Sequence, residues 1–150
     1  MSQHTTFVIG APGSGKGTLC QALSDCMPCH HLSVGDHLRK LMNTMPVEPA
    51  QLGGLTRDQL QQHMQNRELI APGNILAILQ EEIKRAPTNA KVLIDGFPRD
   101  LESAKLWDEK FGPPEQVLFF DCKKEEAKQR FLSRSRDAGD DEAVFEKEVC

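Results

Sequence analysis

The sequence predicts a three-layer α/β/α fold, in which helices cover both faces of a parallel sheet. The first observation is a glycine-rich loop at residues 10–18, directly behind the apolar run Phe7-Val8-Ile9. The second is that further apolar runs, at 91–95 and 117–122, alternate with segments of helical periodicity. This alternation indicates right-handed crossovers and places ligands at the carboxyl ends of the strands.

Length and charge restrict the class of protein. The 150 residues fit one domain with a substantial core, and the net charge of −4 argues against nucleic acid as the main partner. The chain has no run of about 18 apolar residues, and its amino-terminal residues lack a signal-peptide pattern. We therefore expect a monomeric protein without membrane contacts in the cytoplasm, with the nucleus as the alternative compartment.

The five cysteines form an odd set without export signals, which favours free thiols. Cys26-Met-Pro-Cys29-His30 has the spelling of a haem-attachment motif, and Cys-x-x-Cys is also half of a zinc site. Haem attachment normally requires export, and zinc would need two further ligands. Because His30 and His31 alternate faces on a short strand, chelation by both is awkward, and free thiols remain the preferred interpretation.

The glycine-rich loop has the composition of a phosphate-binding loop. Its glycines let the backbone approach an anion closely and aim successive N–H groups at it, near the start of the next helix. Lys16 adds a charge suited to phosphates, and Thr18 offers a hydroxyl on the metal side. Gly17 stands where the strict pattern has Ser or Thr. The predicted phosphate-binding residues are Gly13, Ser14, Gly15, Lys16, Gly17 and Thr18.

The first half of the chain is expected to combine two strands with three helices. The helix after the loop carries Leu19 and Leu23 on one side, as an amphipathic helix does. Ser33 or Gly35 can cap the next helix, which places Arg39 on its first turns. The predicted elements are the strand 5–10, the helix 16–25, the strand 29–32, the helix from 33 or 35, the loop 43–54 and the helix 56–67 capped by Thr56.

The second half continues the alternation. Ile75, Ile78 and Ile83 recur at helical spacing, whereas Lys91–Asp95 is a continuous run typical of a strand buried on both faces. Asp95 ends this strand beside the phosphate loop, where a carboxylate can hold water around Mg²⁺. The predicted elements are the helix 73–85, the turn 86–89, the strands 91–95 and 117–122, and the helix from 124 through 134.

Three motifs together resemble the nucleoside monophosphate kinases, which move the γ-phosphoryl group of ATP to a nucleoside monophosphate. They are the loop Gly10–Thr18, the octet Leu32–Arg39 and the block Asp95–Arg99. The resemblance covers nearly all 150 residues and implies one P-loop kinase domain. It also implies a helical acceptor-binding insert at about 33–72, a short lid at about 134–141, ATP as the donor and Mg²⁺ as its cofactor.

The same resemblance assigns roles to individual residues. Arg39 and Arg99 would grip the acceptor phosphate, Arg130 would stack on the adenine of ATP, and Arg134, four residues further, would reach its phosphates. Asp95 would hold Mg²⁺ through water. The implied catalytic residues are Lys16, Arg39, Arg99 and Arg134; the ATP-binding residues are Gly13, Ser14, Gly15, Lys16, Gly17, Thr18, Arg130 and Arg134; the acceptor-binding residues are Ser33, Gly35, Arg39, Ala71, Gly96, Arg99, Asp100 and Ser103.

The lid departs from the family pattern. Family members carry Gly-Arg-x-Asp-Asp there, whereas this chain reads Asp137-Ala-Gly-Asp-Asp141 and lacks the arginine unless Arg136 replaces it. Glu148 or Val149 stands where the family has a further catalytic arginine on a helix. One arginine near a migrating phosphoryl group is worth roughly 10³–10⁵ in rate. We therefore expect nucleotide binding to be retained and turnover to be weak.

Two other departures concern the acceptor insert and the end of the chain. Family members end the insert with Gly-x-Leu-Val-Pro, but Arg67–Pro72 lacks the glycine and is one residue longer. The chain stops at Cys150, a strand and a helix short of the usual fold. We therefore expect a C-terminally truncated kinase with four strands, the fifth missing, and an exposed sheet edge at Val117–Asp121.

The closest likeness within the family is to the uridylate–cytidylate kinases. Cys20, Trp107 and the strand 117–122 match them, and Val34 lacks the hydroxyl that adenylate kinases usually place there. Pyrimidine-specific members have Asn where this chain has Asp100, and a carboxylate cannot donate a hydrogen bond as an amide does. UMP or CMP is thus the expected acceptor and AMP the alternative. The alternative of another class is a catalytically weak ATP-binding module.

Overall fold

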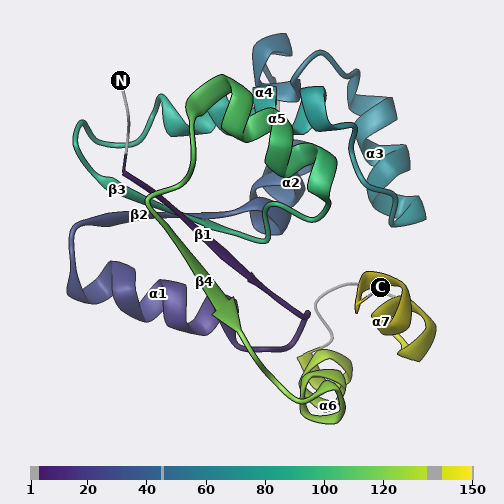
Figure 1. Ribbon diagram of the computed structural model, residues 1–150. Coiled ribbons are helices and arrows are strands. Elements are labelled where there is room, and N and C mark those ends of the chain that lie inside the picture. The colour runs from purple at the N-terminus through teal and green to yellow at the C-terminus, as the bar shows by residue number, and fades with distance from the viewer. Residues whose placement is uncertain (1–3, 45, 135–139, 150) are drawn as a thin grey trace.

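A four-stranded sheet forms the centre of the computed structural model, which describes residues 4–44, 46–134 and 140–149. All three strand pairings are parallel, so the four carboxyl ends share one edge. Figure 1 shows this common direction, with β1 between β3 and β4. The strands, in the spatial order β2-β3-β1-β4, are β2 (Cys29–Ser33), β3 (Lys91–Asp95), β1 (Thr5–Gly10) and β4 (Gln116–Phe120).

Helices lie on both faces of the sheet, so the predicted three-layer α/β/α architecture is confirmed. In Figure 1, α1 lies on one face, α2, α4 and α5 lie on the other, and α6 and α7 lie beyond the carboxyl ends of β1 and β4. None of the helices in the described ranges is both long and apolar enough to cross a membrane. The helices are α1 (Lys16–Cys26), α2 (Val34–Asn43), α3 (Arg57–Asn66), α4 (Pro72–Ile83), α5 (Leu101–Phe111), α6 (Lys124–Arg134) and α7 (Glu142–Val149), with the 3₁₀ helix η1 (Pro49–Leu52).

The two faces of the sheet belong to two separate hydrophobic clusters. Phe7, Leu32 and Ile94 join the larger cluster with the buried side chains of α2, α4 and α5. Val8, which follows Phe7 in β1, and Leu93, which precedes Ile94 in β3, join the smaller cluster with α1. This alternation of neighbours along β1 and β3 follows from the two-residue period of a strand. It fixes which strand residues can meet α1.

The helix caps expected at the starts of α2 and α3 are both present. The Ser33 side chain accepts a hydrogen bond from the backbone N–H of Asp36, so Ser33 rather than Gly35 caps α2. Thr56 and Gln59 form a reciprocal capping box at the start of α3. The predicted loop 43–54 is wrong in part, because a 3₁₀ helix that begins at Pro49 interrupts it.

Helix α5 was not among the predicted elements. Its sequence mixes charged and apolar residues, and Ser103 and Trp107 are the residues it buries. The Asp100 side chain caps it by accepting from the backbone N–H of Ser103 at 2.7 Å. The ring of Trp107 packs edge-on against Phe7 of β1 with the centroids 5.2 Å apart, which fixes the helix on the sheet.

Strand β4 lies at the edge of the sheet, as expected. It pairs with β1 on one side, and within the described residues no strand pairs with its other side. Val117 is 52% exposed and Phe119 is 67% exposed, so the edge presents apolar side chains to solvent. The strand ends at Phe120, two residues before the predicted end at Cys122.

Candidate functional site

The glycine-rich loop connects β1 to α1 at the carboxyl edge of the sheet, as predicted. Gly13 has a positive φ of 81°, and a Cβ added there would lie 2.1 Å from the carbonyl oxygen of Ala127. A side chain at this position would therefore collide with the backbone of α6. Gly15, with φ 95°, caps α1. The glycine spacing thus serves two purposes, the turn itself and its close contact with α6.

Lys16 folds back over the loop that precedes it. Its ammonium group donates hydrogen bonds to the carbonyl oxygens of Gly10 and Ala11, both at 2.8 Å. These carbonyls hold the charge at the mouth of the loop. To bind a phosphate oxygen, the ammonium must exchange one or both of these bonds for charge-assisted ones, which are stronger.

Three charged side chains surround Lys16, two from the end of β3 and the segment after it and one from the end of α6. Burial lowers the pKa of Lys16 below its usual range, and the nearby guanidinium groups of Arg99 and Arg134 lower it further. The Asp95 carboxylate opposes these effects and raises the pKa. Three predicted cationic residues, Lys16, Arg99 and Arg134, therefore lie close enough to interact electrostatically. The carboxylate of Asp95, the predicted metal-site residue, also interacts with Lys16. An anion placed there would relieve the repulsion among the cations.

Two hydroxyl groups border the loop. Ser14 is buried, and within the described part of the chain its Oγ has no hydrogen-bond partner. Thr18, on the first turn of α1, is exposed. A buried hydroxyl without a partner is costly, and a bound ligand would satisfy it. Their predicted contacts with ATP remain predictions.

Asp95 ends β3 next to the loop. It is 8% exposed, and its Oδ2 lies 3.6 Å from the position that a Cβ on Gly17 would occupy. Its carboxylate accepts from, or pairs with, His31 Nε2 at 3.4 Å. Mg²⁺ binds through one or two carboxylates, several waters and substrate phosphates, so a single carboxylate beside a phosphate loop fits that ion.

The two arginines predicted to grip the acceptor phosphate follow neighbouring strands, β2 and β3, at the same edge of the sheet. Arg39 lies over Gly35 and donates to Oδ1 of Asp36 at 2.5 Å. Arg99 is exposed, and its Nε donates to the carbonyl oxygen of Gly96 at 3.3 Å. Their convergence on one phosphate remains a prediction.

Several other predicted acceptor-binding residues cap helices. Ser33 caps α2, Ala71 precedes α4, and Asp100 caps α5. Asp100 also accepts from the hydroxyl group of Ser103 at 3.0 Å, and Ser103 is 2% exposed. The carboxylate and the hydroxyl group are therefore hydrogen-bonded to each other. To contact the base of an acceptor nucleotide, they would have to share or exchange this hydrogen bond.

The arginines of α6 have different surroundings. Arg130 is exposed, and its Nη1 lies 3.9 Å from Sγ of Cys122. Arg134 lies over the ring of Phe131, 4.3 Å from its centroid, and its Nε donates to Asp140 at 3.4 Å. Arg134 thus lies near the phosphate loop, consistent with its electrostatic effect on Lys16. Arg136 and the lid residues 135–139, like Cys150, lie outside the described residues.

Arg67 was not assigned a role from the sequence, yet it joins the carboxyl-terminal end of α3 to α7. Its guanidinium donates to Asp140 at 3.1 Å and to Glu148 at 3.0 Å. Burial lowers the pKa of Arg67, but these hydrogen bonds outweigh burial and raise the pKa above its usual range. The sequence offered little indication of a role for Arg67, because this residue lies in the segment 67–72 that departs from the family pattern.

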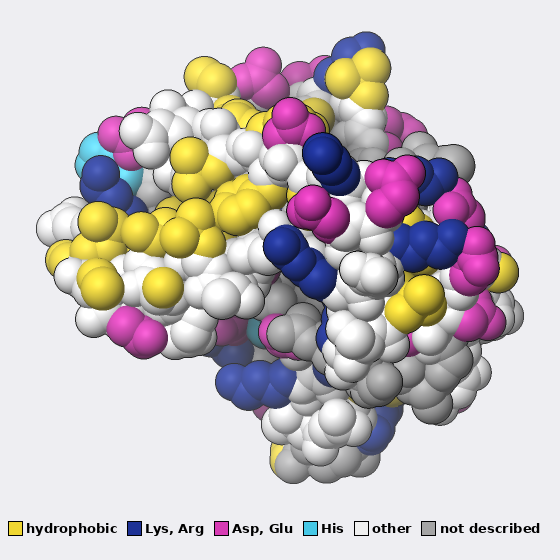
Figure 2. Space-filling model, turned by 90° about the horizontal axis from the view of Figure 1, so that it is seen from below, with side chains coloured by type: hydrophobic (Ala, Val, Ile, Leu, Met, Phe, Trp, Pro, Cys, Tyr) yellow, Lys and Arg dark blue, Asp and Glu magenta, His cyan; other side chains and the backbone are white. Residues whose placement is uncertain are grey.

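One face of the molecule separates hydrophobic from charged side chains. Figure 2 shows hydrophobic side chains gathered on one side of the face seen from below, and charges of both signs interspersed on the other. Within the described residues drawn on this face, the cations form no continuous basic stripe.

Comparisons with known proteins agree with the motifs. Residues 8–148 match the family model for adenylate kinase. The chain is 34% identical over 141 residues to UMP-CMP kinase from Prunus armeniaca, covering 93% of this chain and 57% of that protein. It is 35% identical over 147 residues to adenylate kinase isoenzyme 1 from Cyprinus carpio, covering 95% and 72%. It is 36% identical over 137 residues to probable UMP-CMP kinase 2 from Arabidopsis thaliana, covering 91% and 49%.

Proposed function

Because the chain belongs to the adenylate kinase family, we propose that it transfers the γ-phosphoryl group of ATP to a nucleoside monophosphate. The observation that supports this most directly is the cluster of Lys16, Arg99, Arg134 and Asp95 at the phosphate loop. Phosphoryl transfer needs positioning and cations around the migrating charge rather than a protein nucleophile. This cluster has the composition that such chemistry needs.

In the proposed reaction, an acceptor phosphate oxygen attacks the γ-phosphorus of ATP. The bond from that phosphorus to the β–γ bridging oxygen breaks, leaving ADP and a nucleoside diphosphate. Lys16 moves from the carbonyl oxygens of Gly10 and Ala11 to phosphate oxygens. Asp95 would hold Mg²⁺ through water, and the ion would neutralise charge on the phosphates when bound. Arg134 approaches ATP from α6, and Arg99 approaches the acceptor from the end of β3.

We propose UMP or CMP as the acceptor, held by Arg39 and Arg99, with AMP as the alternative. The relatives at similar identity include both UMP-CMP kinases and adenylate kinases, so the comparisons support either. The pyrimidine proposal depends on Cys20, Val34 and Trp107, the residues that favoured it in the sequence. We further propose that residues 33–72 form the acceptor insert of a single monomeric cytoplasmic kinase domain, and residues 134–141 its lid.

The proposal is tested by a coupled assay of ADP formation, with CMP, UMP, dCMP and AMP supplied separately. We expect acceptor-dependent ADP formation, fastest with CMP or UMP, and its loss in Lys16→Ala. If turnover were fastest with AMP, AMP rather than UMP or CMP would be the acceptor. ATP binding without acceptor-dependent turnover would overturn the kinase assignment itself.

A second candidate is a nucleotide-binding module with weak turnover, which the charges near the lid favour. Arg67 and Arg134 are matched there by the carboxylates of Asp140 and Glu148, so these four described residues leave no net positive charge. A carboxylate close to the transferring phosphoryl group would repel it. Glu148→Arg separates the candidates, because a gain in turnover of tenfold or more would support weak basal catalysis limited by this charge.

A further inference from the structure

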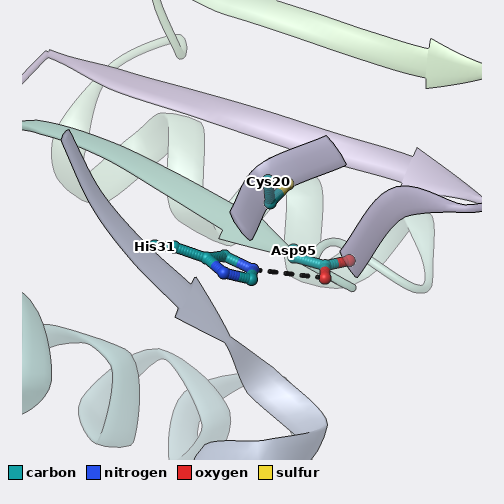
Figure 3. A group of neighbouring side chains, drawn as sticks. All are labelled: Cys20, His31 and Asp95. Atoms are coloured by element: carbon teal, nitrogen blue, oxygen red, sulfur yellow. Dashed lines mark hydrogen bonds and ion pairs between the residues drawn. The ribbon is translucent and has the colours of Figure 1, made fainter. Parts of the chain in front are cut away.

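Three potential metal ligands from three different elements meet behind the phosphate loop. They are the thiol of Cys20 on α1, the imidazole of His31 on β2 and the carboxylate of Asp95 at the end of β3. Their ligand atoms all lie within 4.8 Å of one another, and His31 Nε2 is 3.4 Å from Asp95 Oδ2. Figure 3 shows the imidazole and carboxylate facing each other beneath the helix that carries the thiol.

The register of the sheet explains why these residues meet. His31 lies opposite Leu93, and Ser33 lies opposite Asp95, in the parallel pairing of β2 with β3. Because side chains alternate along a strand, His31, Leu93 and Asp95 point to the same face. Leu93 packs in the cluster with Cys20, so this face is the one that α1 covers. The grouping is therefore built into the strand pairing rather than into flexible surface side chains.

The arrangement has the dimensions of a metal site. Ligands bound tetrahedrally to Zn²⁺ at about 2.0–2.3 Å lie roughly 3.3–3.8 Å from one another. The 3.4 Å between His31 and Asp95 already matches one such edge, and because the other pairs lie within 4.8 Å, side-chain shifts of at most about 1 Å would complete the geometry. Cys20 is 1% exposed and Asp95 is 8% exposed, whereas the His31 side chain is 14% exposed, so the site is largely buried but keeps one side open to a water ligand.

We propose that Cys20, His31 and Asp95 bind a soft divalent cation such as Zn²⁺, with water as the fourth ligand. A thiolate, an imidazole and a carboxylate together suit Zn²⁺, whereas Mg²⁺ prefers oxygen ligands alone. On binding, the sulfur–metal bond replaces the S–H bond and the thiol proton leaves to solvent. This site differs from the Cys26–Cys29 pair considered from the sequence, and from the water-mediated Mg²⁺ role of Asp95.

The site has a consequence for catalysis, which rests on the proposed kinase function. Asp95 cannot orient the water of Mg²⁺ while it is bound to another cation. The cation should therefore inhibit phosphoryl transfer, but ATP should still bind to the phosphate loop by contacting Lys16. Binding can be measured without nucleotide, so its failure and the failure of the kinase proposal are distinguishable.

The test titrates the nucleotide-free protein with Zn²⁺ by calorimetry and with Co²⁺ by absorption spectroscopy. We expect one equivalent of Zn²⁺ to bind, and Co²⁺ to produce a sulfur-to-metal charge-transfer band. Cys20→Ser should abolish the band, and His31→Gln should weaken Zn²⁺ binding about tenfold or more. Cys26→Ser, at an exposed thiol, and His30→Gln, on the other face of β2, are the matched controls and should leave both signals unchanged.

Folding of each variant is checked by circular dichroism, and Cys20→Ala serves as a second variant if Cys20→Ser unfolds. A band that survives in the Cys20 variant but disappears in Cys26→Ser or Cys29→Ser would overturn the proposal in favour of the Cys26–Cys29 pair. Absence of saturable Zn²⁺ binding by the folded wild type would also overturn it. Loss of binding in His30→Gln with retention in His31→Gln would contradict the proposed face.

Discussion

Arg67 donates a hydrogen bond of 3.0 Å to Glu148, a residue 81 positions away in the sequence. The same guanidinium contacts Asp140, whose side chain is 2% exposed and also accepts from Arg134. Nearby, Lys147 Nζ donates to the carbonyl oxygen of Asn66 at 3.0 Å. The carboxyl-terminal end of α3 and helix α7 are thus joined by three described side chains and one backbone group. This contact connects the proposed acceptor insert to the far side of the proposed lid.

Arg67→Ala is expected to destabilise the protein by about 1–3 kcal/mol, because it leaves the buried Asp140 carboxylate with fewer cationic partners. Urea unfolding gives the free energy of unfolding. Arg67 also has a positive φ of 54°, which costs a non-glycine residue about 1 kcal/mol. Arg67→Gly should therefore be less destabilised than Arg67→Ala by about that amount. Equal stability of Arg67→Ala and the wild type would show that the ion pairs contribute nothing.

Lys16→Ala is expected to weaken binding of ATP–Mg²⁺ about tenfold or more, because charge-assisted bonds to phosphate are lost. Calorimetry measures the affinity directly. Lys84→Ala is a suitable control, since Lys84 lies at the end of α4 and pairs with Glu81 on that helix. Unchanged ATP affinity in Lys16→Ala would refute the assignment of the loop.

Arg39→Ala and Arg99→Ala should each weaken binding of the acceptor monophosphate and leave ATP affinity nearly unchanged. A charge-assisted hydrogen bond is worth about 1.5–3 kcal/mol, which corresponds to about tenfold or more in affinity. Calorimetry with CMP and with ATP gives both affinities for each variant. Loss of ATP binding with intact CMP binding would mean that the donor and acceptor sites are reversed.

Gly13→Ala is expected to destabilise the protein by about 2–4 kcal/mol, from overpacking against Ala127 and from strain at positive φ. Gly73→Ala is the matched control, because a Cβ there meets open space on the first turn of α4. This control should gain about 0.5–1 kcal/mol. Urea unfolding of both variants measures the difference, and similar stabilities would contradict the close contact between the loop and α6.

The sheet was predictable because its signals are local. Val92-Leu93-Ile94 is an uninterrupted apolar run between Lys91 and Asp95, and the structure contains a strand with the predicted bounds Lys91–Asp95. Helix α5 was missed because Leu101–Phe111 mixes charged and apolar residues and depends on Trp107 packing against Phe7. The 3₁₀ helix was missed because Pro and Gly in 43–54 are equally typical of a loop.

The parts of the candidate site that short sequence motifs form were predictable. The glycine spacing predicted the phosphate loop, and the position of Asp95 at the end of a strand predicted a carboxylate at the carboxyl edge of the sheet. The contact of Arg67 with Glu148 depends on tertiary packing across 81 positions, which no local pattern encodes. The meeting of His31 with Asp95 depends on strand register, and it could have been found had β2 and β3 been aligned as neighbours.

Histidine 37 should make stability fall as the solution becomes acidic. The side chain of His37 is 9% exposed, and burial lowers its pKa below the usual 6.5. The carboxylate of Glu82 opposes this shift, and Lys40, Arg85 and His30 add to it. Well above pH 6.5 the ring is neutral in both the folded and unfolded states, so the full stability is present. Below that pH the ring is protonated in the unfolded state but stays neutral in the folded state until the pH reaches the lowered pKa. Protonation therefore favours the unfolded state in this range.

The free energy of unfolding should therefore decrease between about pH 6.5 and the lowered pKa of His37, with a slope of up to about 1.4 kcal/mol per pH unit. Urea unfolding measured from about pH 5 to pH 8 gives this slope. His37→Gln should flatten it, because no group at that position then titrates. Glu82→Gln should extend the loss to lower pH, since removing the carboxylate leaves the charged ring less stable in the folded state. Stability that rises as the pH falls below 6.5, or a slope that His37→Gln leaves unchanged, would mean that the ring charges readily in the folded protein.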